Sequence, residues 1–111
     1  MTSYVIEVTD LAVEELRAIR AFDRRPILDA IRQQLTHEPT VITRNRKRLE
    51  PLVPRFETVP PIWELRVGEY RVFYDVDEDG KIVYVRAVAG NHRDKLQRRS
   101  WDETVNHRTI F

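Results

Sequence analysis

Positively charged side chains gather in the middle of this chain. Four of them stand in one run of five residues, Arg44-Asn45-Arg46-Lys47-Arg48, and three more follow at Arg55, Arg66 and Arg86. A cluster of guanidinium and ammonium groups binds a nucleic-acid backbone through contacts that depend on salt and not on base sequence. The cluster therefore indicates contact with RNA or DNA phosphates. Two other interpretations stay open, a solvated loop and a docking segment for an acidic protein partner.

Other kinds of site find little support in the sequence. No cysteine is present, which excludes a disulfide framework and a thiolate metal site. The three histidines (His37, His92 and His107) are scattered and lack the spacing of metal ligands. With three glycines the chain has no Gly-rich phosphate loop, and Ser3 and Ser100 lie too near the ends to suggest a catalytic triad. We expect no metal and no cofactor.

Length and composition are those of one domain. The chain has 111 residues, of which 41% are hydrophobic and 33% charged. The net charge of +1 hides an asymmetry, because residues 1–43 carry five Arg and seven Asp or Glu, whereas residues 44–111 carry fourteen Lys or Arg and eleven Asp or Glu. No apolar run approaches the roughly 20 residues that span a bilayer, and the N-terminus lacks the pattern of a signal peptide. We expect a cytoplasmic protein that does not enter a membrane.

The first third of the chain predicts a strand followed by two helices. Residues 4–8 alternate as a short strand does, and Thr9 and Asp10 are helix-capping types. Apolar residues at helical spacing then predict one helix over 10–21 and a second from Asp23 to about residue 36. Residues 39–61 contain five of the six prolines and the basic run, and predict a long surface loop.

The next part of the chain predicts three antiparallel strands. The segments 63–67, 70–76 and 81–89 are rich in β-forming residues, and short turns at Gly68-Glu69 and at residues 77–80 join them. We expect the first strand to add to this sheet and the helix pair to cover one face of it, which is an α+β architecture. Residues 93–105 predict a short C-terminal helix, and residues 96–111 form the polar tail.

Alternation along the segment 70–76 assigns its side chains to two faces of the sheet. Tyr70, Val72, Tyr74 and Val76 share one face, and Arg71, Phe73 and Asp75 share the other. The first set has the composition of core. The second suits a base-stacking surface with a cation beside it. The other interpretation of Arg71 is an ion pair across strands with Glu64 or Asp75.

These segments resemble the RelE/ParE superfamily of bacterial toxins over residues 3–95. The similarity is carried by the hairpin Trp63-Glu64-Leu65-Arg66-Val67-Gly68-Glu69-Tyr70-Arg71-Val72-Phe73-Tyr74-Asp75-Val76, by its basic lead-in over residues 43–49, and by the last strand with the turn at Gly90-Asn91-His92-Arg93. The resemblance implies a single RelE/ParE-like domain over residues 1–111. It also implies a toxin of a toxin–antitoxin module, with a cognate antitoxin as partner.

The resemblance further implies an activity and its residues. RelE-like toxins inhibit translation by ribosome-dependent mRNA cleavage, and Arg71, His92 and Arg93 match positions of their catalytic cluster. On this basis Arg71 clamps phosphate, His92 shuttles a proton near neutral pH and Arg93 supplies positive charge. The RNA-binding residues would be Arg44, Arg46, Lys47, Arg48, Arg66 and Arg86.

The same comparison of residues leaves an alternative open. Where the nucleases place lysines on the strand before the glycine turn, this chain has Ile62 and Glu64, and no tyrosine follows Tyr84. A carboxylate at that position repels a phosphate. The alternative is a non-enzymatic ParE-like gyrase inhibitor, or a degenerate toxin that acts only as the binding partner of an antitoxin.

Overall fold

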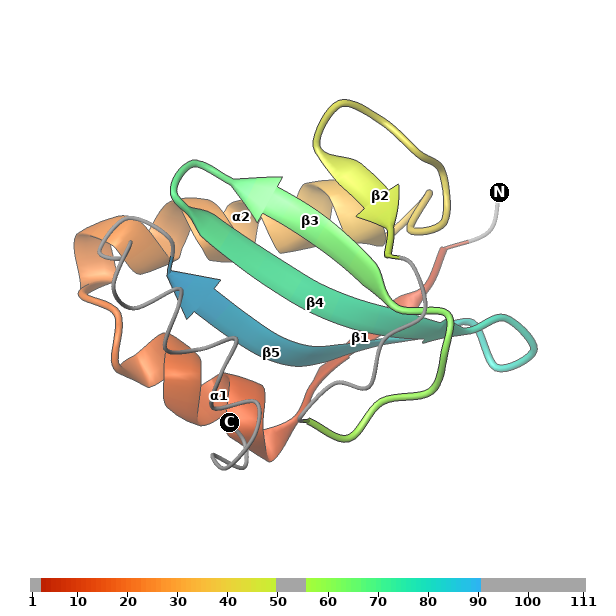
Figure 1. Cartoon of the computed structure of the whole chain (residues 1–111), viewed down its shortest axis with the longest axis horizontal. Coiled ribbons are helices and arrows are strands. Elements are labelled where there is room, and N and C mark those ends of the chain that lie inside the picture. Colours follow the sequence, from red (N-terminus) through yellow and green to blue (C-terminus); the bar gives the residue numbers. More distant parts are fainter. Residues whose placement is uncertain (1–2, 50–55, 91–111) are drawn as a thin grey trace.

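A computed structural model describes residues 3–49 and 56–90 of the chain. Its elements, in chain order, are β1 (Val5–Val8), α1 (Asp10–Arg17), α2 (Ala21–Leu35), β2 (Arg46–Arg48), β3 (Trp63–Val67), β4 (Tyr70–Asp77) and β5 (Ile82–Gly90). The predicted α+β architecture is confirmed (Figure 1). The predicted C-terminal helix and tail lie outside the described residues.

The five strands form one sheet in the order β1-β5-β4-β3-β2. The strands β3, β4 and β5 make the antiparallel meander that the sequence predicts, and β1 adds to it in parallel beside β5. The remaining strand, β2, lies inside the segment that was predicted to be a loop, and it pairs antiparallel with β3. Its three residues are too few for a periodicity that sequence inspection would detect.

A capping residue starts the first helix, and the joint between the two helices lies a few residues earlier in the chain than predicted. Thr9 caps α1, because its side-chain oxygen accepts the backbone N–H of Ala12. This helix ends at Arg17 rather than near residue 21, and α2 begins at Ala21 rather than at Asp23. Arg20, the residue before α2, has the extended backbone that a helix cap requires. No helix of the described ranges 3–49 and 56–90 is long and apolar enough to cross a membrane.

The main hydrophobic core lies between the helices and one face of the sheet. It contains residues of both helices and of β3, β4 and β5, among them Leu16, Ile27, Leu65, Val72 and Tyr74. Tyr70 and Val76 pack against this core, so the predicted division of β4 into two faces is confirmed. The side chains of the other set therefore lie on the face of the sheet that is turned away from α2, here called the distal face.

A second, smaller cluster lies on the distal face. Phe56, Phe73 and Ala87 are buried together there, and the two phenylalanine rings lie 5.7 Å apart. Between β4 and β5 the register shifts, since Phe73 pairs with Ala87 and Tyr74 pairs with Val85. Arg86 is thus the extra residue of a β-bulge, a feature that redirects a side chain.

Candidate nucleic-acid interface

The distal face carries three of the predicted cationic residues on three neighbouring strands. Lys47 of β2 lies opposite Glu64 of β3, and Arg66 of β3 lies opposite Arg71 of β4. Residues that face each other across an antiparallel pair point to the same side of the sheet. The strand register therefore brings Lys47, Arg66 and Arg71 together on one face, around Glu64.

Arg66 and Arg71 are a directly opposed pair of like charges. The N–H of Arg66 donates to the carbonyl of Asn45 at 2.8 Å, so its backbone bonds turn toward β2 and away from β4. In an antiparallel ladder such residues form the pairs whose side chains approach most closely. Two cations in this position repel each other. A bound anion between them would remove the repulsion, which makes the pair a candidate phosphate site.

Glu64 lies beneath these cations and is itself nearly buried. Its Oε2 is 3.7 Å from Nε of Arg71, and the two side chains are 6% and 28% exposed. The cross-strand pair that the sequence left open as an alternative for Arg71 is thus present, with Glu64 as the partner. Nε of Arg71 is buried and has no hydrogen-bond acceptor within the described part of the chain. Among the described residues, Arg71 is therefore held by charge and its Nε–H donates no hydrogen bond.

Arg46 is directed away from the distal face. Its side chain is buried, and its guanidinium donates to the carbonyl of Gln34 at 2.9 Å and to the carbonyl of Glu38. The carbonyl of Gln34 lies in the last turn of α2, where cations are favourable because the helix dipole is negative there, and Glu38 lies just past the end of that helix. Arg46 thus ties β2 to α2. Its guanidinium is occupied by these carbonyls in this structure, whereas its place in the basic run predicts contact with RNA.

The other two cations of the basic run are exposed. Thr43 and Arg46 exchange two backbone hydrogen bonds, so Arg44 lies in the two-residue turn between them. Arg48 pairs with Trp63 at the edge of the sheet, on the opposite face from Lys47. The side chains of Arg44 and Arg48 are exposed to solvent and accessible to a ligand. The assignment of six residues to RNA binding stays a prediction: Arg44, Arg46, Lys47, Arg48, Arg66 and Arg86.

Arg86 is part of a buried polar cluster around Asp75. The carboxylate of Asp75 is 2% exposed and accepts Nε of Arg86 at 2.7 Å. The same oxygen accepts the hydroxyl of Thr58 at 2.8 Å and the N–H of Val59 at 3.0 Å. The cluster fixes the segment before β3 against the sheet. Sequence inspection missed this role of Asp75, because its partners lie 11 to 17 positions away.

Phe73 is also buried, so its ring is not available for the base stacking that its position suggested. It packs against Phe56 and is 4% exposed. Two of the predicted catalytic residues, His92 and Arg93, and the cation Arg55 lie outside the described residues. Within residues 3–49 and 56–90 no group of three or more His, Cys, Asp or Glu side chains is placed to hold a metal ion.

A family assignment follows from comparison with known proteins. The profile of the ParE toxin of the type II toxin–antitoxin system parDE matches residues 6–95. The chain belongs to the ParE toxin family. This confirms the superfamily expected from the hairpin sequence, and makes the protein the toxin of a type II pair whose partner is a cognate antitoxin. Among curated proteins no sequence matches this ParE-family toxin significantly.

Solved structures share its fold at low sequence identity. The RelBE2 toxin–antitoxin complex of Mycobacterium tuberculosis has 20% identity and a TM-score of 0.65, with 81% of this chain and 100% of that chain covered. The RelE–RelB complex of Pyrococcus horikoshii has 23% identity and a TM-score of 0.63, with 85% and 100% covered. The isolated RelE toxin of E. coli has 19% identity and a TM-score of 0.62, with 90% and 97% covered.

Proposed function

We propose that this ParE-family toxin inhibits translation by cleaving mRNA on the ribosome, with its distal face against the RNA backbone. The observation that carries the proposal is the opposed pair Arg66 and Arg71, with Lys47 on the neighbouring strand. Two like charges that face each other in a folded protein repel, so a bound ligand of opposite charge stabilises the arrangement. A phosphate group has that charge, and a guanidinium binds it through two parallel hydrogen bonds.

The chemistry asks for a base, an acid and positive charge. The 2′-oxygen attacks the neighbouring phosphorus while its proton passes to the base. The bond from phosphorus to the 5′-oxygen breaks, and the acid protonates that oxygen, leaving a 2′,3′-cyclic phosphate and a 5′-hydroxyl. In the proposal Arg71 stabilises the added negative charge at phosphorus. His92 transfers the protons and Arg93 adds charge. Because ribosomes translate their messages in the cytoplasm, the proposed action takes place there.

The second candidate function is binding without catalysis, as a ParE-like gyrase inhibitor or as a partner of the antitoxin alone. The buried Glu64 favours it. A carboxylate 3.7 Å from Arg71 offsets part of the positive charge that a nuclease needs at the scissile phosphate. Glu64 is also too enclosed to reach a 2′-hydroxyl. In this function the distal face is a binding surface only.

Induced expression in a bacterial host separates the two functions. The parent chain and Arg66→Ala are compared, because Arg66 is exposed and its removal leaves no buried charge behind. Arg25→Ala on α2 is the matched control, since it removes the same charge from the other side of the molecule. Transcript ends are mapped before and after induction, and plasmid supercoiling is measured in the same cultures.

The nuclease proposal expects growth arrest with new cuts in translated messages, spaced in phase with codons. Cutting should fall at least about tenfold in Arg66→Ala, which corresponds to about 1.4 kcal/mol, and should be unchanged in Arg25→Ala. Arrest with intact messages and altered supercoiling would replace the proposal by gyrase inhibition. Growth without arrest would leave the binding function.

A further inference from the structure

Glu64 is a buried charge that takes no part in the chemistry of the proposed function. It lies on β3, opposite Lys47 of β2 on one side and opposite Phe73 of β4 on the other. Arg71 stands one diagonal step away on β4, and Arg66 follows two positions along β3. Diagonal and next-but-one neighbours on one face of a sheet lie about 7 Å apart, within reach of long side chains. Glu64 therefore has three cations around it.

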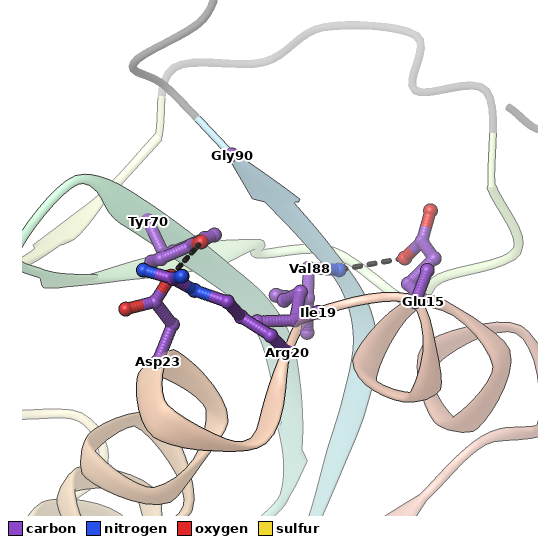
Figure 2. Close-up of a pocket in the computed structure, with 8 residues that line it drawn as sticks. Glu15, Ile19, Arg20, Asp23, Tyr70, Val88 and Gly90 are labelled. Carbon is purple, nitrogen blue, oxygen red and sulfur yellow. Dashed lines mark hydrogen bonds and ion pairs between the residues drawn. The ribbon is translucent and has the colours of Figure 1, made fainter.

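The alternation of β4 separates these cations from the helix side of the sheet. Tyr70 lines a pocket on the helix side, where its hydroxyl donates to the carboxylate of Asp23 at 3.2 Å (Figure 2). Because successive residues of a strand point to opposite faces, the next residue, Arg71, points to the distal face. The carboxylate that Arg71 meets on that face is Glu64.

The pairing of Glu64 with Arg71 is loose. Oε2 of Glu64 and Nε of Arg71 are 3.7 Å apart, which is too long for a hydrogen bond, and the buried Nε–H has no acceptor among the described residues. By contrast, Asp75 accepts Nε of Arg86 at 2.7 Å. A guanidinium that is held by attraction alone can exchange one anion for another without breaking a hydrogen bond. Arg71 thus faces a fixed anion that a phosphate can replace.

The charge of Glu64 acts in opposite directions on the empty and the occupied phosphate site. In the empty site it attracts Arg71 and reduces the repulsion between Arg66 and Arg71. In the occupied site it repels the bound phosphate, because like charges close together near a protein surface still interact. Affinity depends on the difference between the two states. Both effects lower the affinity, so Glu64 weakens the contact of this face with a phosphate backbone.

We propose that Glu64 is a specificity-determining residue, a fixed anion that competes with phosphate for Arg71 and keeps the affinity of the distal face for free RNA low. Non-specific affinity for a nucleic acid comes almost entirely from phosphate contacts. With that affinity reduced, free RNA does not retain the toxin, and stable binding requires further contacts that the ribosome supplies. This role of Glu64 rests on the proposed function, in which RNA is the ligand of the distal face.

Binding to free RNA tests this role. The probe is a labelled, unstructured single-stranded RNA, and fluorescence anisotropy gives its Kd for the full-length toxin at several salt concentrations, without ribosomes. Glu64→Gln removes the charge and keeps the shape of the side chain. Asp29→Asn is the matched control, because Asp29 is 52% exposed and lies on α2, away from the distal face. Arg66→Ala is measured alongside, and melting temperatures report whether each variant is folded.

The Kd should fall at least about tenfold in Glu64→Gln and change less than about twofold in Asp29→Asn. The slope of log K against log salt concentration should also steepen by about 0.7, the value for one more phosphate contact on a single strand. Replacing a side chain that has only a structural role would not tighten binding. A folded Glu64→Gln that binds RNA no more tightly than the parent would overturn the role of Glu64. Unchanged binding by Arg66→Ala would instead count against the proposed function.

The parent chain allows a second measurement that does not depend on the folding of Glu64→Gln. The Nε–H of Arg71 gives an NMR signal that is assigned by its loss in Arg71→Lys. Added RNA should shift this signal in proportion to the bound fraction, because phosphate replaces Glu64 as the anion nearest to the guanidinium. The signal of Arg24, whose Nη1 donates to the carbonyl of Leu16 at 3.3 Å on the helix side, should stay in place. RNA binding that leaves the Arg71 signal unmoved would overturn the proposed competition.

Discussion

At the scale of single residues, buried charges decide what the cations of this toxin can do. Asp75 fixes Arg86 at 2.7 Å, and Glu64 holds Arg71 at a looser 3.7 Å. The first pair is hydrogen-bonded and the second is not, which leaves Arg71 with more freedom to turn toward a ligand. Two arginines on adjacent strands of one sheet thus have different roles, and their sequence environments alone do not separate them.

Asp75→Asn tests the first of these roles. Removing one partner of a buried ion pair leaves the other charge uncompensated, and we expect the free energy of unfolding to fall by about 3 kcal/mol. Urea denaturation measures the change. Asp79→Asn, in the exposed turn between β4 and β5, is the control and should change stability by less than about 0.5 kcal/mol. Equal stability of Asp75→Asn and the parent would contradict the structural role of the cluster.

Tyr74 gives a prediction for alkaline pH. Burial raises the pKa of Tyr74, against a smaller lowering by the charge of Arg46, and its hydroxyl donates to the carbonyl of Pro39 at 2.6 Å. A group whose pKa is raised on folding contributes stability that is fully present below its unfolded pKa, about 10, and is lost as the pH rises beyond it.

The variant Tyr74→Phe isolates this contribution. Near pH 8 we expect it to be less stable than the parent by about 1 kcal/mol, from loss of the hydrogen bond to Pro39. Urea denaturation at pH 11 should show a smaller gap, because the parent then loses the stability of its neutral phenol and the variant has none to lose. A gap that stays constant from pH 8 to pH 11 would contradict the prediction.

At the scale of elements, β2 depends on a contact that no local pattern contains. Three residues cannot form a strand by propensity, and β2 exists because Arg46 binds carbonyls at the end of α2 while Lys47 faces Glu64. The longer strands could be predicted from alternation alone, and so could the two faces of β4. The predicted position of the joint between the helices was wrong by a few residues, because helix caps are predicted from single residues and not from a periodic pattern.

Arg46→Met tests the dependence of β2 on α2. The variant keeps the apolar stem and removes the donors, so the backbone amides of Leu49 and Arg66, which bond across β2 and β3, should exchange with solvent faster. Amides between β4 and β5 should keep their protection. Arg48→Met is the matched control, because Arg48 is exposed on the same strand. Similar amide exchange in Arg46→Met and Arg48→Met would mean that β2 forms without the contact between Arg46 and α2.

The candidate site shows the same division between what a sequence indicates and what only a fold can show. The charge of Arg66 and Arg71 was evident from the sequence, and their direct opposition came from the register of β3 and β4. The hydroxyl of Tyr70 donates to Asp23 across 47 positions of the chain. Nothing local to either residue indicates the other, so no inspection of the sequence would have found this contact.

At the scale of the whole molecule, the sheet separates the helix side from the distal face, which carries Lys47, Arg66 and Arg71 around Glu64. In the proposed function the distal face contacts an anionic target. Cleavage should then weaken as salt rises, because contacts to phosphates are screened and release counterions.

The most direct test of the nuclease function is a reconstituted translation reaction with one defined message and purified toxin. Message cleavage is followed over time for the parent, for Arg66→Ala and for the control Arg25→Ala. A nuclease that acts on the ribosome should cut the message only when ribosomes are translating it. Cutting should be at least about tenfold slower with Arg66→Ala and should proceed at the parental rate with Arg25→Ala. An intact message with the parent toxin, or equal slowing by both substitutions, would contradict the nuclease function.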